Sequence, residues 1–399
     1  MDGYVHPDFG PVSERLHGML SKRSTVGGAA VAVFHRGELV VDVWGGARDA
    51  AGRPWERDTM ATSFSTTKGV VATVVHRLAD RGELAYDDPV AVHWPEFALG
   101  GKESITIRHL LTHQAALHAV RPLVRTAEDL LDWDEMVRKM AAARPAWTPG
   151  RHSGYHALTY GWLVGEVIRR VTGLTVDEAV QREVAAPLGL DSMFIGLAPE
   201  RRGRAADLLF DERAEQRLDR MVHFLERFDR YRPFVEALYV DDMAAMFRSH
   251  RIHDGEIPAA NGVFTARDLA RMYAVLATPD AFEGPPFLSK ATLAEATRAQ
   301  VAGRDIVLGF PMRWRLGYHL AATTRRRQTR QRGRFPPDAP LAPGRPALAP
   351  GRRAPAGPGL RQRRPDLPDR PGVRHQRRPR CRPGVPAAFP GRGPRARPV

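Results

Sequence analysis

Two short apolar runs near the start of the chain have the pattern of a β-hairpin. Ala29 to Phe34 and Leu39 to Trp44 are rich in apolar and β-branched residues, and Arg36-Gly37-Glu38 lies between them. Such runs, separated by a turn that contains glycine, are typical of paired antiparallel strands. The preceding stretch from Val12 to Leu20 is amphipathic. We expect it to form a helix that packs on the hairpin.

Longer segments repeat their apolar residues at the spacing of an α-helix. Beyond Lys68 the apolar pairs recur at helical spacing, at Val70-Val71, Val74-Val75 and Leu78-Ala79. Leu158 to Val171 has the same period and is closed by Gly173, a helix stop signal. Leu130 to Ala143 is also predicted to be helical and is stopped by Pro145, because proline cannot continue a helix.

The stretch from Glu212 to Phe228 is predicted to be a long charged helix. Its apolar residues form one stripe, made of Leu218, Met221, Val222, Leu225 and Phe228. In this position we expect it to wall or cover a cleft, although a plain surface helix packed through its stripe is the commoner arrangement.

The tetrapeptide Ser65-Thr66-Thr67-Lys68 stands at the start of the first predicted helix after the hairpin. Its spacing puts a hydroxyl and an amine one turn apart on the same face. A serine hydroxyl is a poor nucleophile until a base takes its proton, and a partly desolvated lysine can be that base. The helix N-terminus also offers free backbone N–H groups to an anion. A chain of this length should contain about one Ser-x-x-Lys by chance. The motif therefore indicates a catalytic site only together with other matching residues.

Tyr155 is the first such residue. Trp147-Thr148-Pro149-Gly150 contains a turn, and Tyr155-His156-Ala157 follows directly before the helix that begins near Leu158. A tyrosine at this place is more often a packing residue than a base. Tyr155 can nevertheless face the Ser65 and Lys68 pair and share its proton.

These motifs resemble those of the serine beta-lactamase and penicillin-binding-protein superfamily, and within it the class C and family VIII esterase-like members. Ser65 and Lys68 match its nucleophile motif, and Tyr155 matches the first residue of its Tyr-x-Asn motif. Between about Gly27 and Leu320, further segments match in order: Arg81-Gly82-Glu83-Leu84, Asp87-Asp88-Pro89-Val90, Leu110-Leu111-Thr112-His113 with Leu117, and Asn261-Gly262 before Ala266-Arg267-Asp268-Leu269-Ala270.

The resemblance implies an α+β fold of the beta-lactamase/transpeptidase type, an antiparallel sheet flanked by helices. We expect a hydrolase domain over residues 1–324, with a helical subdomain at about 70–260. The implied catalytic residues are Ser65, Lys68 and Tyr155. The resemblance further implies that the backbone N–H of Ser65 and a second N–H, from a third-motif strand, bind the oxyanion.

The sequence departs from this pattern at two places. Ala157 stands where penicillin-active members usually have an asparagine whose amide holds the lactam, so lactam recognition is disfavoured and ester chemistry is not. The third motif, a lysine or histidine followed two residues later by glycine, should lie beyond residue 300. The histidine candidates, His319-Leu320-Ala321 and His375-Gln376-Arg377, lack the glycine, and no lysine follows Lys290.

The end of the chain has a different composition from the rest. Residues 325–399 hold 21 Arg, 3 Asp and no Lys or Glu, and they contain 17 of the 33 Pro. This stretch is predicted to be disordered, because it cannot bury a core. It is either a basic arm that binds nucleic acid, an ordinary extension, or the product of a shifted reading frame. We favour the frame shift, since out-of-frame G/C-rich codons yield Arg, Pro, Ala and Gly, and the missing motif and C-terminal strands should begin there.

Other classes of function find little support in the sequence. No apolar segment is long enough for a membrane span, residues 1–10 do not resemble a signal peptide, and Cys381 is the only cysteine, so we expect a cytoplasmic protein. His109 and His113 are too few for a metal site, and no cofactor-binding fingerprint is present. Neither a nucleic acid nor a membrane is expected as a partner, and the oligomeric state is left open.

We therefore predict a serine hydrolase of esterase type that acts on small esters or amides through an acyl-enzyme. The alternatives are a beta-lactamase or D-Ala-D-Ala carboxypeptidase-like enzyme, or a damaged, non-catalytic homologue whose nucleophile survives without its oxyanion strand. The choice between Lys68 and Tyr155 as the base stays open, because a coupled pair titrates jointly. The natural substrate stays open, because specificity in this superfamily comes from loops.

Overall fold

The hairpin predicted near the N-terminus forms most of a three-stranded antiparallel sheet. In the computed structural model, which describes residues 1–22, 26–209 and 212–320, strands β2 (Gly28–His35) and β3 (Glu38–Gly46) are joined by Arg36 and Gly37. Both turn residues have positive φ, 53° and 88°, as the tight turn that matches the strand twist requires. Strand β1 (Asp2–Val5) pairs with the other edge of β3. The sequence did not predict β1, because this strand has only four residues, mostly exposed, and no alternation of apolar and polar residues.

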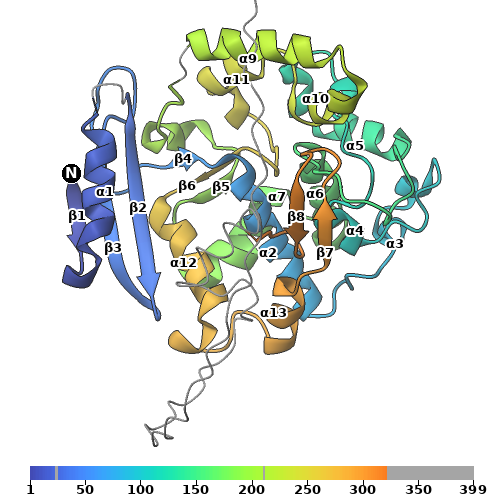
Figure 1. Ribbon diagram of the computed structural model, residues 1–399. Coiled ribbons are helices and arrows are strands. Elements are labelled where there is room, and N and C mark those ends of the chain that lie inside the picture. The colour runs from blue at the N-terminus through green and yellow to red at the C-terminus, as the bar shows by residue number, and fades with distance from the viewer. Residues whose placement is uncertain (23–25, 210–211, 321–399) are drawn as a thin grey trace, which may run out of the picture. The chain divides into compact units, whose positions relative to one another are not determined.

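Helices cover both faces of this sheet (Figure 1). Helix α1 (Gly10–Leu20) packs Leu16 against Val41 and Val43, as its amphipathic pattern predicts. Because successive side chains of a strand point to opposite faces, Asp42 lies on the other side. There it forms a 2.9 Å ion pair with Arg267 of helix α12 (Ala266–Ala277).

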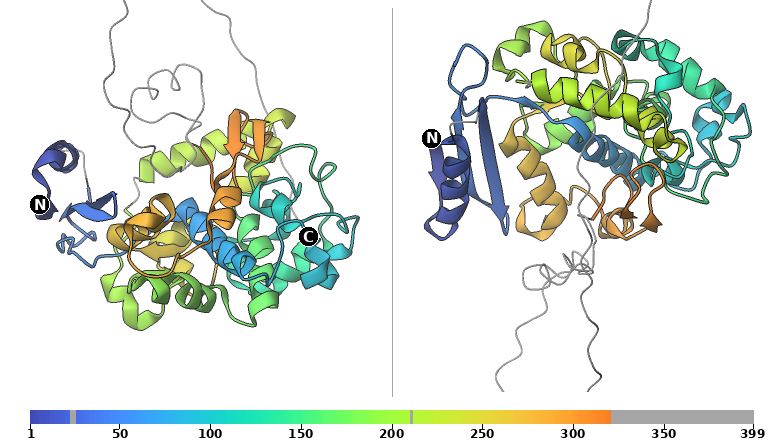
Figure 2. Two further views of the ribbon diagram at one scale, coloured as in Figure 1. Left: turned by 90° about the horizontal axis from the view of Figure 1, so that it is seen from below. Right: turned by 45° about the horizontal axis from the view of Figure 1, so that its top comes forward.

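Helix α2 (Thr67–Asp80) is buried on nearly all sides. It contacts α6 (Thr159–Thr172), α7 (Val176–Val180) and α13 (Lys290–Thr297), as Figures 1 and 2 show. A helix enclosed in this way keeps its ends fixed relative to its neighbours. The nucleophile motif at its N-terminus therefore stands on a rigid element.

Two smaller antiparallel sheets lie near the start of α2. In the first, β6 (Gly262–Phe264) pairs with both β4 (Ala61–Thr62) and β5 (Met193–Ile195). The second is the hairpin of β7 (Val301–Arg304) and β8 (Pro311–Trp314). Strand β4 leads directly into the segment that carries Ser65, so the first sheet anchors the nucleophile from its N-terminal side.

The remaining α-helices are α3 (Val90–His93), α4 (Ile107–Leu111), α5 (Trp133–Ala142), α8 (Ala186–Leu188), α9 (Glu212–Leu225), α10 (Arg232–Leu238) and α11 (Met243–Arg248). No helix in the described ranges is long and apolar enough to cross a membrane. The prediction for residues 325–399 lies outside the described residues.

Two helix predictions need correction. The segment Leu130 to Ala143 is divided, because Asp132 is extended and its side chain accepts the N–H of Glu135, which starts α5 anew. Helix α9 ends at Leu225 and not at Phe228. Its stripe is only partly buried, since Val222 is covered while Met221 and Phe228 are exposed.

Candidate active site

Ser65 lies in a short 3-10 turn, Phe64–Thr66, directly before α2. The preceding Phe64 has a φ of 47°. A non-glycine residue seldom adopts this left-handed conformation, which is held in place by surrounding structure and occurs often at functional sites. Ser65 itself is exposed. No hydrogen bond within the described residues occupies its backbone N–H, so this donor is free to bind an anion at the helix start.

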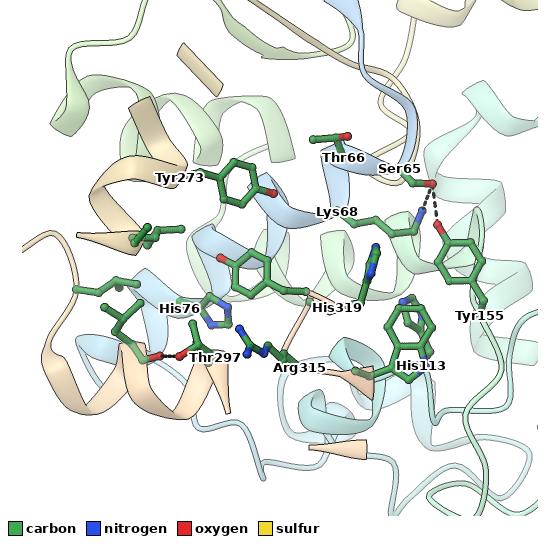
Figure 3. A pocket seen from close by; sticks show the side chains of 18 residues that line it. Ser65, Thr66, Lys68, His76, His113, Tyr155, Tyr273, Thr297, Arg315 and His319 are labelled. Atoms are coloured by element: carbon green, nitrogen blue, oxygen red, sulfur yellow. Dashed lines mark hydrogen bonds between the residues drawn. The ribbon is translucent and has the colours of Figure 1, made fainter. Parts of the chain in front are cut away.

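Three side chains predicted from the sequence meet at one point (Figure 3). The Nζ of Lys68 lies 3.1 Å from the Oγ of Ser65, and the hydroxyl of Tyr155 donates to the same Oγ at 2.7 Å. The sequence thus predicted correctly that Tyr155 faces the Ser65 and Lys68 pair. A hydroxyl in contact with both an amine and a phenol is arranged for proton transfer.

Lys68 is almost completely buried, with 4% of its surface exposed. Its Nζ donates to two backbone carbonyls, that of Ala157 at 2.7 Å and that of Ala259 at 2.9 Å. Burial lowers the pKa of Lys68 to about 7, because a desolvated ammonium is disfavoured. An amine with such a pKa is substantially neutral at physiological pH.

The matching segment around Asn261 holds one of these carbonyls in place. The Asn261 side chain accepts the N–H of Ile257 and donates to the carbonyls of Ile252 and Gly255, which closes the loop that carries Ala259. At Gly262 an added Cβ would come within 2.6 Å of Thr67 Oγ1. Glycine is therefore required for the close approach of this loop to α2.

The ring of Tyr155 packs against two other rings, which also contact each other. Trp314 of β8 stacks parallel to it, with ring centroids 5.7 Å apart. The ring of His113 meets it edge-on at 5.0 Å. Burial, followed by the negative charge of Asp305, raises the pKa of Tyr155. The phenol is therefore protonated at neutral pH.

A cavity of about 430 Å³ opens beside these residues. Its polar part is lined by Ser65, Lys68, Tyr155 and His319, and its apolar part by residues of α12 and α13 and the segment between them, among them Leu276, Leu288 and Leu293. No described residue of α9 lines it, so the sequence-based idea that this helix walls or covers a cleft finds no support here.

The other residues singled out from the sequence have structural partners. His109 accepts the N–H of Thr106 in a helix cap, and His113 packs against Tyr155. The methyl group of Ala157 belongs to a buried apolar cluster and does not line the cavity. His319 lines the cavity, but Ala321 stands in the sequence where the third motif has its glycine. His375 lies outside the described residues.

Comparison with known proteins identifies the family. Residues 16–343 match the sequence model of the family described as Beta-lactamase. The chain belongs to the beta-lactamase family. It is 38% identical over 323 residues to the esterase/beta-lactamase LipL of Mycobacterium tuberculosis, covering 79% of this chain and 74% of LipL.

Solved structures of the family have the same fold. A family VIII carboxylesterase is 34% identical, with a TM-score of 0.69 over 81% of this chain and 84% of that one. A penicillin-binding-protein homologue from Caulobacter crescentus is 33% identical, with a TM-score of 0.66 over 80% of this chain and 83% of that one. These similarities confirm the predicted α+β beta-lactamase/transpeptidase-like fold and the assignment to esterase-type serine hydrolases.

Proposed function

We propose that this chain hydrolyses small esters through an acyl-enzyme formed on Ser65. The observation that carries the proposal is the pair of contacts made by Ser65 Oγ, 3.1 Å to Lys68 Nζ and 2.7 Å to the hydroxyl of Tyr155. Water then hydrolyses the acyl-enzyme and releases the acid, so one difficult step is divided into two easier ones.

Lys68 is the proposed base. A neutral amine has two hydrogens and one lone pair. The carbonyls of Ala157 and Ala259 accept those hydrogens, which leaves the lone pair for the proton of Ser65. The lowered pKa of Lys68, about 7, supports this assignment.

Tyr155 is the proposed proton relay. Its raised pKa keeps the phenol protonated, so it cannot take the proton of Ser65 first. In acylation the proton of Ser65 passes to Lys68 as Oγ bonds to the ester carbonyl carbon. When the bond from that carbon to the alkoxide breaks, Tyr155 gives its proton to the leaving alkoxide, and the Lys68 ammonium returns a proton to Tyr155. The Ser65 N–H at the start of α2 would stabilise the oxyanion.

An ester is favoured over a lactam as the substrate, because no side-chain amide stands at position 157 and the Ala157 methyl is buried away from the cavity. We expect kcat/KM for an aryl acetate to exceed that for a chromogenic cephalosporin by about 10²-fold. Both reactions are measured on the same preparation, with the Ser65→Ala variant as the background. A higher kcat/KM for the cephalosporin would reverse the ranking in favour of a beta-lactamase.

The base assignment predicts a pH dependence. Because Lys68 must be neutral to accept a proton, kcat/KM should rise with pH and level off above the pKa of the free enzyme, about 7. The profile is recorded from pH 5 to 9 with an aryl ester that does not itself titrate. A rate that is flat between pH 5 and 9 would exclude Lys68 as the base.

The same assays address the remaining alternatives. A D-Ala-D-Ala carboxypeptidase would release D-alanine from a peptide faster than it hydrolyses aryl acetates. A damaged, non-catalytic homologue would show no turnover above the Ser65→Ala background. A cytoplasmic location stays a prediction, supported by the lack of cysteine before Cys381.

A further inference from the structure

Three consecutive backbone N–H groups around Tyr155 are bound by only two residues. The N–H of Gly154 donates to the carbonyl of His113 at 2.9 Å, and the N–H of His156 donates to Nδ1 of the same histidine at 3.2 Å. Between them, the N–H of Tyr155 donates to Oδ1 of Asp305 at 3.0 Å. The backbone that carries Tyr155 is therefore held by the segment after α4 on one side and by the β7–β8 hairpin on the other.

Asp305 is completely buried and accepts four hydrogen bonds. Besides Tyr155, its Oδ1 accepts the N–H groups of Val307 at 3.0 Å and Leu308 at 2.9 Å. Its Oδ2 accepts the indole N–H of Trp314 at 3.2 Å. A buried carboxylate needs such donors, since an unpaired charge in the interior is very unfavourable.

These bonds connect Asp305 to both parts of Tyr155. One oxygen holds the Tyr155 backbone, and the other orients Trp314, whose ring stacks on the phenol with an interplanar angle of 2°. The N–H of Ile306 also donates to the carbonyl of Ser153, which joins the tip of the hairpin to the same segment. Asp305 does not line the cavity, so it cannot touch a substrate there.

We propose that Asp305 is a positioning residue that holds the Tyr155 hydroxyl in place against Ser65 Oγ through the β7–β8 hairpin. This inference rests on the proposed role of Tyr155 as the proton relay. The sequence held no signal for it, because Asp305 lies outside every motif that matched and reaches Tyr155 only through the folded chain.

The charge of Asp305 has a second effect on the same phenol. A carboxylate nearby disfavours the tyrosinate, so its removal should lower the pKa of Tyr155. Among the described residues, the other groups around the phenol that carry an exchangeable proton lie on several elements. They are Ser65 and Lys68 at the start of α2, His113 after α4, His156 next to Tyr155 in the chain, Tyr160 on α6 and His319 across the cavity. Burial lowers the pKa of His113 well below its usual value, which leaves that ring neutral at physiological pH.

The test replaces Asp305 by asparagine in the full chain. The asparagine side-chain oxygen can still accept the three backbone N–H groups. Its NH₂ group, however, replaces the oxygen that accepts the indole N–H of Trp314, so two donors face each other and this hydrogen bond is lost. We expect kcat for an aryl acetate to fall by about 10- to 100-fold with little change in KM. The alkaline limb of the kcat profile, where Tyr155 ionises, should move to lower pH.

Two further variants keep the result interpretable. Asp268→Asn is the matched control, because Asp268 is also a buried carboxylate that accepts backbone N–H groups, those of Asp191 and Ser192, and it does not line the cavity. It should leave kcat and both limbs of the pH profile unchanged.

If Asp305→Asn does not fold, Asp305→Ser is used, since a serine hydroxyl can still cap the N–H groups of Val307 and Leu308.

The double variant with Tyr155→Phe separates this inference from the proposed function. If Asp305 acts through the Tyr155 hydroxyl, adding Asp305→Asn to Tyr155→Phe should cost little further rate. Additive losses, or an alkaline limb that does not move, would overturn the positioning role. Full activity of Tyr155→Phe alone would instead refute the relay assigned to Tyr155, whatever Asp305→Asn does.

Discussion

Replacing Ser65 by alanine is expected to lower kcat for aryl-ester hydrolysis by about 10⁴-fold or more, because Ser65 Oγ is the one hydroxyl of the described residues that hydrogen-bonds to Lys68 Nζ. Ser65 is exposed and its Oγ contacts only Lys68 and Tyr155 among the hydrogen bonds of the described residues. The substitution should therefore leave the fold intact. Turnover is measured with an aryl acetate, and folding by the melting temperature.

A serine-reactive fluorophosphonate provides an independent measurement. Mass spectrometry should find the label on Ser65 in the wild-type chain and no label in Ser65→Ala. Ser63→Ala is the matched control, because its hydroxyl lies two residues away, bonds Thr67 Oγ1 at 3.1 Å and does not line the cavity. That variant should be labelled normally. Label on another residue, or undiminished hydrolysis by Ser65→Ala, would refute the nucleophile.

The second large effect is expected from Tyr155→Phe. Phenylalanine keeps the ring that packs against Trp314 and His113 but removes the hydroxyl that donates to Ser65 Oγ. The loss of this proton relay should lower kcat by about 10²–10⁴-fold. The melting temperature should change little, since the aromatic packing is preserved. Near-full activity with an unchanged melting temperature would mean that Tyr155 is only a packing residue.

The sequence predicted the elements whose signals are local. Helix α6 ends before Gly173, which has a φ of 71°, and the hairpin turns at Arg36 and Gly37. Both positions require conformations that residue type alone indicates. Where the outcome depended on a single side chain, as at Asp132, periodicity gave the wrong boundary, because a helix cap interrupts a pattern that otherwise continues.

The candidate site was predicted only in part for a similar reason. Ser65, Lys68 and Tyr155 belong to short motifs, so the sequence could name them. The groups that tune them could not be named. The carbonyls of Ala157 and Ala259 bind Lys68 from two distant loops, and the carboxylate of Asp305 binds a backbone N–H 150 positions away. Every residue has a backbone carbonyl, so the residue type does not show which carbonyls will bind Lys68. Only the folded chain brings these groups together.

The two carbonyls that hold Lys68 have a consequence for how this gene tolerates change. Because both acceptors are main-chain atoms, no side-chain substitution at position 157 or 259 can delete them. Both residues are buried, so large side chains would be excluded by size, while glycine and serine would fit. As far as the contact with Lys68 is concerned, a mutational scan would therefore show a limit on side-chain volume at these two positions and little dependence on side-chain chemistry.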